Sequence, residues 1–189
     1  MNKNLHMPNR LRKIICYFMS IALVGMIGIP VFASETKEDN PEVVVRVYAN
    51  SHDEEYILNI PFDDGTVVGD YNYSIEYVTQ KTRDPIYITY FFDYVGWITR
   101  DGVVSLSLDP SDDVRKNGSS RDSAWNILKD PTYGVGNDAN WPTQSSNVQT
   151  LKWQYDCHWS FANSKDYWNL EPSRTASSYA AVVLAGCNP

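Results

Sequence analysis

The residue type best suited to acid–base chemistry is scarce in this chain. Beyond the first 33 residues the sequence has two histidines, His52 and His158, and a histidine general base would have to be one of them. His158 stands between Cys157 and Trp159. That setting is also typical of a histidine packed in a core with one hydrogen bond satisfied. The sequence leaves both roles open for His158 and favours the structural one.

Carboxylates close to His158 in the sequence would supply the partner group of a hydrolytic site. Asp156 and Glu171 are the candidates, and glycoside cleavage in particular uses two carboxyl groups at a defined separation. Arg174 follows Glu171 by three residues, so the same glutamate also suits a structural ion pair. The ion pair is the favoured alternative.

Acidic clusters in the chain resemble calcium ligands only superficially. Asp53–Glu55, Asp63–Asp64 and Asp112–Asp113 lack the alternating ligands and the glycine of a calcium loop, and we expect them to be solvated turns. Histidines and cysteines are too few for a structural zinc site. The sequence has no phosphate-binding loop, dinucleotide fingerprint or glycine-flanked serine nucleophile. We therefore expect neither a metal nor a cofactor.

Aromatic residues are abundant, with 6 tryptophans and 13 tyrosines. Such amphipathic rings serve both in ligand-binding faces and in ordinary β-rich cores, and the two uses look alike in a sequence. If a binding face exists, we expect it to combine aromatic and polar residues, most of them near the C-terminus: Trp97, His158, Trp159, Trp168, Glu171 and Arg174.

The first 33 residues have the parts of a secretory signal: a basic start, an apolar run over residues 14–29 and small residues up to Ala33. We expect cleavage after Ala33. The alternative is an uncleaved anchor, but about 16 apolar residues are fewer than the roughly 20 of a spanning helix. Cleavage leaves 12 basic and 23 acidic residues, a net charge of −11. This charge argues against nucleic acid and anionic lipid as partners.

Export would leave two cysteines, Cys157 and Cys187, because Cys16 lies within the signal. An even pair in an exported chain is most simply a disulfide. We therefore expect a Cys157–Cys187 disulfide rather than a catalytic thiol.

Runs of β-branched and aromatic residues predict strands at residues 43–48, 56–62, 67–78, 85–99 and 103–108. We expect the first two to form a hairpin, the third to be a further antiparallel strand and the last two to form a second hairpin. Asp101 and Gly102 suit its tight turn, because both positions tolerate positive φ. Leucines alternate with Ser105 and Ser107, which predicts one buried and one solvated face.

Helices are predicted later in the chain, at residues 120–129, 145–155 and 176–185, with Gly186 as a C-cap. Residues 134–140, rich in glycine and asparagine, are expected to form a surface loop. Strands followed by helices indicate an α+β domain.

Three motifs close to the C-terminus carry a resemblance. They are Cys157-His158-Trp159-Ser160-Phe161-Ala162, Trp168-Asn169-Leu170-Glu171-Pro172 and Ala185-Gly186-Cys187-Asn188-Pro189. Together with the segments around Trp97, Gly102 and Trp125, they make residues 86–189 resemble the exported bacterial proteins called domain of unknown function 2599. The resemblance implies the same disulfide and no particular activity. Ser173 departs from it, since a tryptophan is expected there.

We expect four parts in the chain: a cleaved signal (1–33), a flexible leader (34–41), a β-rich region (42–85) and the C-terminal α+β domain (86–189). The protein is expected to be secreted, free or at the cell wall, without stable membrane insertion after cleavage. A binding module for an envelope glycan or protein is the favoured function. The alternative is a secreted hydrolase or antibacterial effector acting on the wall through His158 and a nearby carboxylate.

Overall fold

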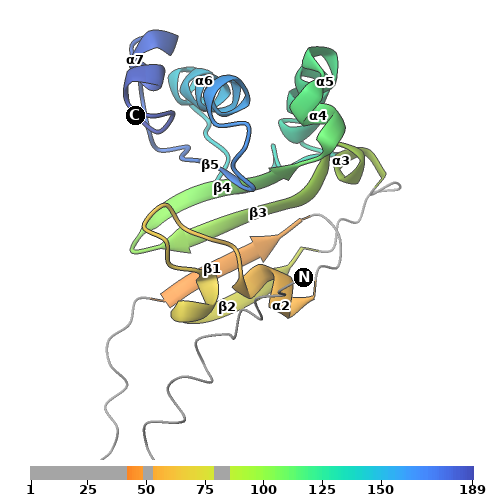
Figure 1. The fold of residues 1–189 in the computed structure, drawn as a ribbon, viewed down its shortest axis with the longest axis vertical. Coiled ribbons are helices and arrows are strands. Elements are labelled where there is room, and N and C mark those ends of the chain that lie inside the picture. The colour runs from red at the N-terminus through yellow and green to blue at the C-terminus, as the bar shows by residue number, and fades with distance from the viewer. Residues whose placement is uncertain (1–41, 49–52, 79–85) are drawn as a thin grey trace, which may run out of the picture. The chain divides into compact units, whose positions relative to one another are not determined.

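The computed structural model describes residues 42–48, 53–78 and 86–189 (Figure 1). The predicted signal and leader lie outside these ranges. Within them the chain forms one five-stranded sheet and six α-helices, with more helix in the C-terminal half, which confirms the α+β class. No helix in these ranges is both long and apolar enough to span a bilayer.

The sheet has the spatial order β2-β1-β3-β4-β5. The strands are Glu42–Val47 (β1), Asn72–Tyr77 (β2), Phe92–Arg100 (β3), Val103–Pro110 (β4) and Trp168–Leu170 (β5). β1 and β2 pair in parallel, and the other three pairings are antiparallel. The sheet therefore unites strands from distant parts of the chain around a central β3–β4 hairpin.

The turn of the central hairpin has the predicted chemistry. Asp101 has φ 53° and Gly102 has φ 75°, and Arg100 pairs with Val103 directly before and after them. Two successive residues with positive φ match the right-handed twist of the flanking strands. The Asp-Gly prediction is confirmed.

The helices are Glu54–Leu58 (α2), Ile86–Phe91 (α3), Asp112–Lys116 (α4), Gly118–Leu128 (α5), Ser145–Phe161 (α6) and Tyr179–Leu184 (α7), with a 3₁₀ turn at Val68–Asp70 (η1). In Figure 1, α4 to α7 lie on one side of the β3–β4 hairpin, and α2 lies beside β1 and β2 on the other. The sheet is thus covered by different parts of the chain on its two faces.

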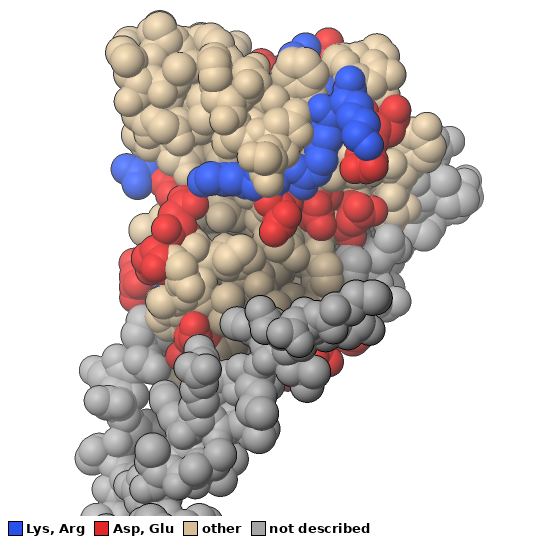
Figure 2. All heavy atoms as spheres, viewed as in Figure 1, with Lys and Arg blue, Asp and Glu red and all other residues tan. Residues whose placement is uncertain are grey.

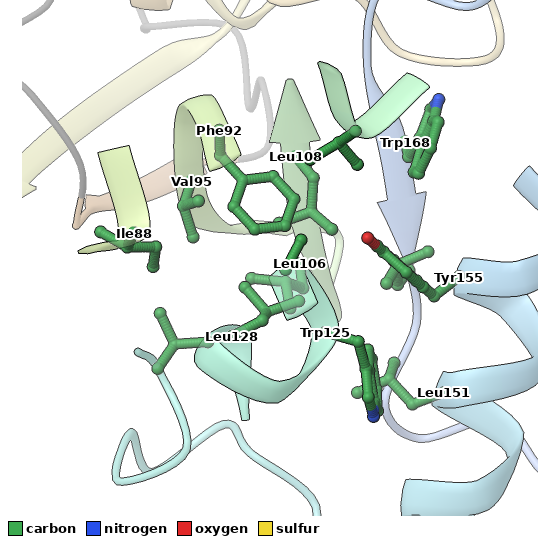
Figure 3. Packing of buried hydrophobic residues seen from close by; sticks show 14 of the residues in the cluster. Ile88, Phe92, Val95, Leu106, Leu108, Trp125, Leu128, Leu151, Tyr155 and Trp168 are labelled. Carbon is green, nitrogen blue, oxygen red and sulfur yellow. The ribbon is translucent and has the colours of Figure 1, made fainter. Parts of the chain in front are cut away.

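The larger core lies between the sheet and α5 and α6 (Figure 3). A row of aromatic rings runs through it, with centroids 5.3 Å apart for Trp125 and Tyr155 and 5.5 Å apart for Tyr155 and Trp168. Leu106 and Leu108 of β4 contribute to the same cluster and are fully buried. We call this side of the sheet the helix-covered face.

A second, smaller core lies on the opposite face. It joins alternate residues of β1 and β3 to the segment that contains α2 and η1, and its buried members are Val43, Val45, Val47, Ile57, Ile60, Val68, Tyr94 and Ile98. Successive strand residues point to opposite sides, so β3 sends Tyr94 and Ile98 to this core and Val95 and Trp97 to the other. No residue of β4 belongs to this cluster, so its cover ends at β3.

The first predicted hairpin is wrong. Residues 54–58 form α2 instead of a strand, because Asp53 caps the helix with a hydrogen bond accepted from the Tyr56 backbone N–H at 3.0 Å. Ile57 on α2 and Ile60, two residues after the helix ends, are both fully buried in the second core. β1 pairs instead with β2 and β3.

Three further strand predictions need correction. β2 is parallel to β1, not antiparallel, because α2 and η1 form a crossover between the two strands. Residues 86–91 form α3, in which Ile88 is buried in the larger core, so packing overrides a β-rich composition. Ser107 was expected on a solvated face but is 0% exposed.

The three predicted C-terminal helices are present. α5 agrees closely, α6 runs six residues further than expected, to Phe161, and α7 is shorter, Tyr179–Leu184. Gly186 follows α7 with φ 69°, as a C-cap requires. The loop after α5 includes the fully buried Val135, so it is only partly a surface loop.

Candidate functional site

His158 lies in the interior, on the buried side of α6. It is 2% exposed, and its Nδ1 lies 2.9 Å from the carbonyl oxygen of Gln154, one helical turn earlier. Its ring lies 6.3 Å from that of Trp168. Burial lowers the pKa of His158 below its ordinary value, so the neutral form is favoured. This environment is the one expected for a structural core histidine rather than for a general base.

The carboxylates considered as partners of His158 face other groups. Asp156 pairs with Lys152 and lies 4.0 Å from Arg121, on the side of α6 that faces α5. Glu171 pairs with Arg174, as the sequence suggested. Within the described ranges no hydrogen bond or ion pair joins His158 to either acid, so the three residues do not form one catalytic cluster.

The predicted aromatic face is divided between the core and the surface. Trp97 is 1% exposed and Trp168 is 0% exposed, and both belong to the larger core. Trp159 is half-buried, donates from Nε1 to the Val114 carbonyl at 3.0 Å, and has the Arg121 guanidinium 4.6 Å from its ring. Glu171 and Arg174 of the predicted face both line a groove, which is described below.

The disulfide is formed between Cys157 on α6 and Cys187 after α7. Both cysteines are buried with Val182 in a small third cluster. The covalent bond holds α7 against α6, the helix that also carries Gln154 and His158.

A groove of about 180 Å³ opens on the face opposite the large helices, where the second core ends. We call it the ion-pair groove; it is lined by Phe62, Asp63, Ile98, Arg100, Asp101, Val103, Ser105, Asn169, Glu171 and Arg174. Its floor is formed by β3, β4 and β5, and its sides are the loop after α2 and the segment that follows β5.

Arg100 is held firmly on one side of this groove. Its guanidinium lies 4.1 Å from the centre of the Phe62 ring and donates to Asp64 Oδ2 at 2.8 Å and to the Tyr71 hydroxyl at 3.2 Å. The pKa of Asp64 is lowered, first by the Thr66 hydroxyl, which donates at 2.6 Å, and then by the Thr66 backbone N–H and Arg100. These contacts therefore hold the Arg100 guanidinium in one orientation.

Gln154, on the helix-covered face, positions Glu171 on the other side of the ion-pair groove. Its buried side chain donates from Nε2 to the Glu171 carbonyl at 3.0 Å and accepts from the Glu171 backbone N–H at 2.7 Å. The Glu171 carboxylate in turn accepts from Arg174 Nε. The terminal amino groups of Arg174, whose side chain is 48% exposed, have no partner among the described residues.

Sequence reasoning missed Phe62, Arg100, Asp101 and Gln154 as parts of this arrangement. A signal existed for Gln154, which falls three residues after Leu151 on the apolar side of the predicted helix. A polar side chain at such a position is expected to satisfy buried polar groups. No comparable signal marks Phe62, because its contact with Arg100 depends on how α2 packs.

Many charged side chains of the described residues are paired. Figure 2 shows a band of basic side chains with acidic side chains directly beside it. Lys165 and Asp63 pair at 3.1 Å, and Arg115 and Asp109 pair at 3.0 Å. In the described part of the chain no group of three or more His, Cys, Asp or Glu residues could hold a metal ion.

Comparison with known proteins identifies a family and nothing finer. No curated protein and no solved structure matches the chain. The family model described as "Protein of unknown function (DUF2599)" matches residues 92–189, from the first residue of β3 to the C-terminus. β1 and β2 lie outside the match. Because the match spans just over half of the 189 residues, this chain belongs to that family of proteins of unknown function.

Proposed function

We propose that the protein is an exported binding module of the cell envelope, and that the ion-pair groove holds a wall fragment bearing both amino and carboxylate groups. One observation carries the proposal. The free carboxylate of Asp101 and the free end of the Arg174 guanidinium line the same groove, and neither has a partner among the described residues.

The lining suits a ligand that is charged but nearly neutral overall. Arg100 is already paired with Asp64, Asp63 with Lys165, and Glu171 with Arg174. An amino group would be attracted to Asp101, and a carboxylate would receive charge-assisted hydrogen bonds from Arg174. Amino acid side branches of a bacterial wall carry both groups. An anionic polymer would instead meet the repulsion of an acidic protein.

The side chains of the groove are held in place by several contacts, which supports a binding site rather than charged residues exposed by chance. Arg100 is stacked and hydrogen-bonded, and Glu171 is bracketed by Gln154 from the opposite face of the sheet. A preformed site loses less side-chain entropy when a ligand binds. The Cys157–Cys187 disulfide, a bond that persists in oxidising compartments, supports the exported location.

The test is co-sedimentation of the purified protein with isolated wall sacculi. We expect the protein to pellet with the sacculi and Arg174→Ala to weaken binding about tenfold, because charge-assisted hydrogen bonds are lost. Lys116→Ala is the matched control, since Lys116 is an exposed, paired cation outside the groove. Binding by Arg174→Ala equal to that of the wild type would contradict the proposal.

The same experiment separates the alternative functions. Soluble wall fragments released above the level of a heat-inactivated sample would favour the secreted hydrolase or antibacterial effector. Sedimentation without fragments favours the binding module. If the protein neither pellets nor releases fragments, an envelope protein replaces the wall as the expected partner.

A further inference from the structure

A second groove lies on the helix-covered face, at the same end of the sheet. Its volume is about 350 Å³, at the lower end of the roughly 300–1,000 Å³ of ligand sites. The loop before α6 forms one side, and Val104 of β4 with the segment after β5 forms the other. We call it the amide groove; its main lining residues are Asn140, Trp141, Gln144, Asn147, Pro172 and Ser173.

The lining of this groove contains no ionisable side chain. This is unusual in a chain with 21% charged residues, and it distinguishes the amide groove from the ion-pair groove on the opposite face. Carboxamide and hydroxyl groups both donate and accept hydrogen bonds. They suit a neutral ligand that is rich in hydroxyl and amide groups.

Trp141 supplies an aromatic surface that is held in place from behind. Its ring is half-buried and packs against Trp125, with centroids 5.9 Å apart. Its backbone N–H donates to the Asp138 carbonyl at 3.0 Å, and the Asn140 N–H donates to the Asp138 carboxylate at 2.8 Å. The Trp141 indole N–H donates to no other described residue.

Asp138 anchors this loop to β1. Its side chain is 1% exposed and accepts hydrogen bonds from Arg46 Nη1 at 3.1 Å and from the Tyr48 hydroxyl. A buried carboxylate with several donors is a rigid attachment, because each donor lost would leave charge unsatisfied. The position of Trp141 is therefore determined before a ligand binds.

Two carboxamides beside Trp141 are available to a ligand. The side chains of Asn140 and Gln144 make no hydrogen bond with other described residues, and Gln144 does not cap α6 although it precedes the helix. Asn147 is committed, since its Nδ2 donates to the Pro172 carbonyl at 3.2 Å and so holds the opposite side of the groove.

We propose that the amide groove binds a neutral N-acetylated sugar. One apolar face of the sugar ring stacks on Trp141, which offers a large, rigid apolar area. The N-acetyl amide and ring hydroxyls pair with Asn140 and Gln144. The site is separate from the ion-pair groove, and its ligand carries no charge for Arg174 or Asp101 to recognise.

The experiment is calorimetric titration of the purified full-length protein with a soluble tetramer of N-acetylglucosamine. We expect binding to the wild type, about tenfold weaker binding to Trp141→Ala and about threefold weaker binding to Gln144→Ala. Gln144 is exposed, so its replacement tests the site even if Trp141→Ala folds poorly. Gln149 is also an exposed glutamine, on α6 outside the groove, so Gln149→Ala is the matched control and should bind as the wild type does.

The proposal is overturned if the tetramer fails to bind at millimolar concentrations, or if it binds both Trp141→Ala and Gln144→Ala with wild-type affinity. It is also overturned if an uncharged proline-rich peptide binds the groove and the sugar does not. Because the tetramer is neutral, its binding is measured independently of whether sacculi bind in the ion-pair groove.

Discussion

The two faces of the sheet are built differently. On the helix-covered face, α4 to α6 bury a row of aromatic rings that includes Trp125, Tyr155 and Trp168. On the opposite face, the cover formed by α2 and η1 ends at β3, and polar side chains of β4 and β5 line a groove. The tryptophans and the histidine that the sequence singled out as candidates are mostly buried in the core of the helix-covered face. The ion-pair groove lies where the cover ends on the second.

Substitution of neighbouring residues on β5 tests this difference most directly. Trp168 belongs to the large core, whereas Asn169 lines the ion-pair groove. We expect Trp168→Ala to lower the free energy of unfolding by about 3–5 kcal/mol, because it leaves a cavity. Asn169→Ala should change it by no more than about 0.5 kcal/mol. Urea denaturation measures both, and equal effects would mean that the two faces are equally packed.

Removal of the disulfide is expected to have the next largest effect. Cys157 and Cys187 are separated by 30 residues, and a loop of that size corresponds to about 3.7 kcal/mol of stability. The Cys157→Ala/Cys187→Ala variant should lose this amount in urea denaturation. The reduced wild type is the control and should lose as much. Unchanged stability in both would show that packing alone holds α7 on α6.

Acidification should lower the free energy of unfolding through protonation of His158, which is buried on the helix-covered face. Burial lowers its pKa below the ordinary 6.5 in the folded protein, so at lower pH the unfolded chain binds a proton more readily than the folded one. The free energy of unfolding should therefore fall as the pH drops below about 6.5 and level off below the folded pKa. His158→Asn should remove this part of the pH dependence, and His52→Asn should retain it. A dependence that survives in His158→Asn would assign it to other groups.

The smallest expected change in stability is that of a substitution on the face opposite the helix-covered face. Arg174→Ala removes an ion pair whose arginine is 48% exposed, and it should cost about 0.5 kcal/mol or less in stability. Thermal unfolding monitored by circular dichroism gives the comparison with the wild type. A loss as large as that of Trp168→Ala would make Arg174 a structural residue and would weaken its assignment as a ligand contact.

Local patterns predicted a substantial part of the fold. The Asp101-Gly102 turn, α5, most of α6 and the disulfide depend on local chemistry or on a pair of cysteines, and all are present. The Glu171–Arg174 ion pair was also predicted from spacing. Predictions failed for α2, α3 and the direction of β2, because these depend on which distant strand or helix receives a short apolar segment.

The sequence by itself determined the elements whose cause lies within a few residues: the tight turn, the amphipathic helices, the C-cap at Gly186 and the paired cysteines. Only the tertiary structure decided which side chains are interior and which meet in a groove. Gln154 reaches Glu171 across 17 residues of sequence, and Arg100 reaches Phe62 across 38. Such contacts follow from sheet order and helix packing, which are properties of the whole chain and leave no local pattern.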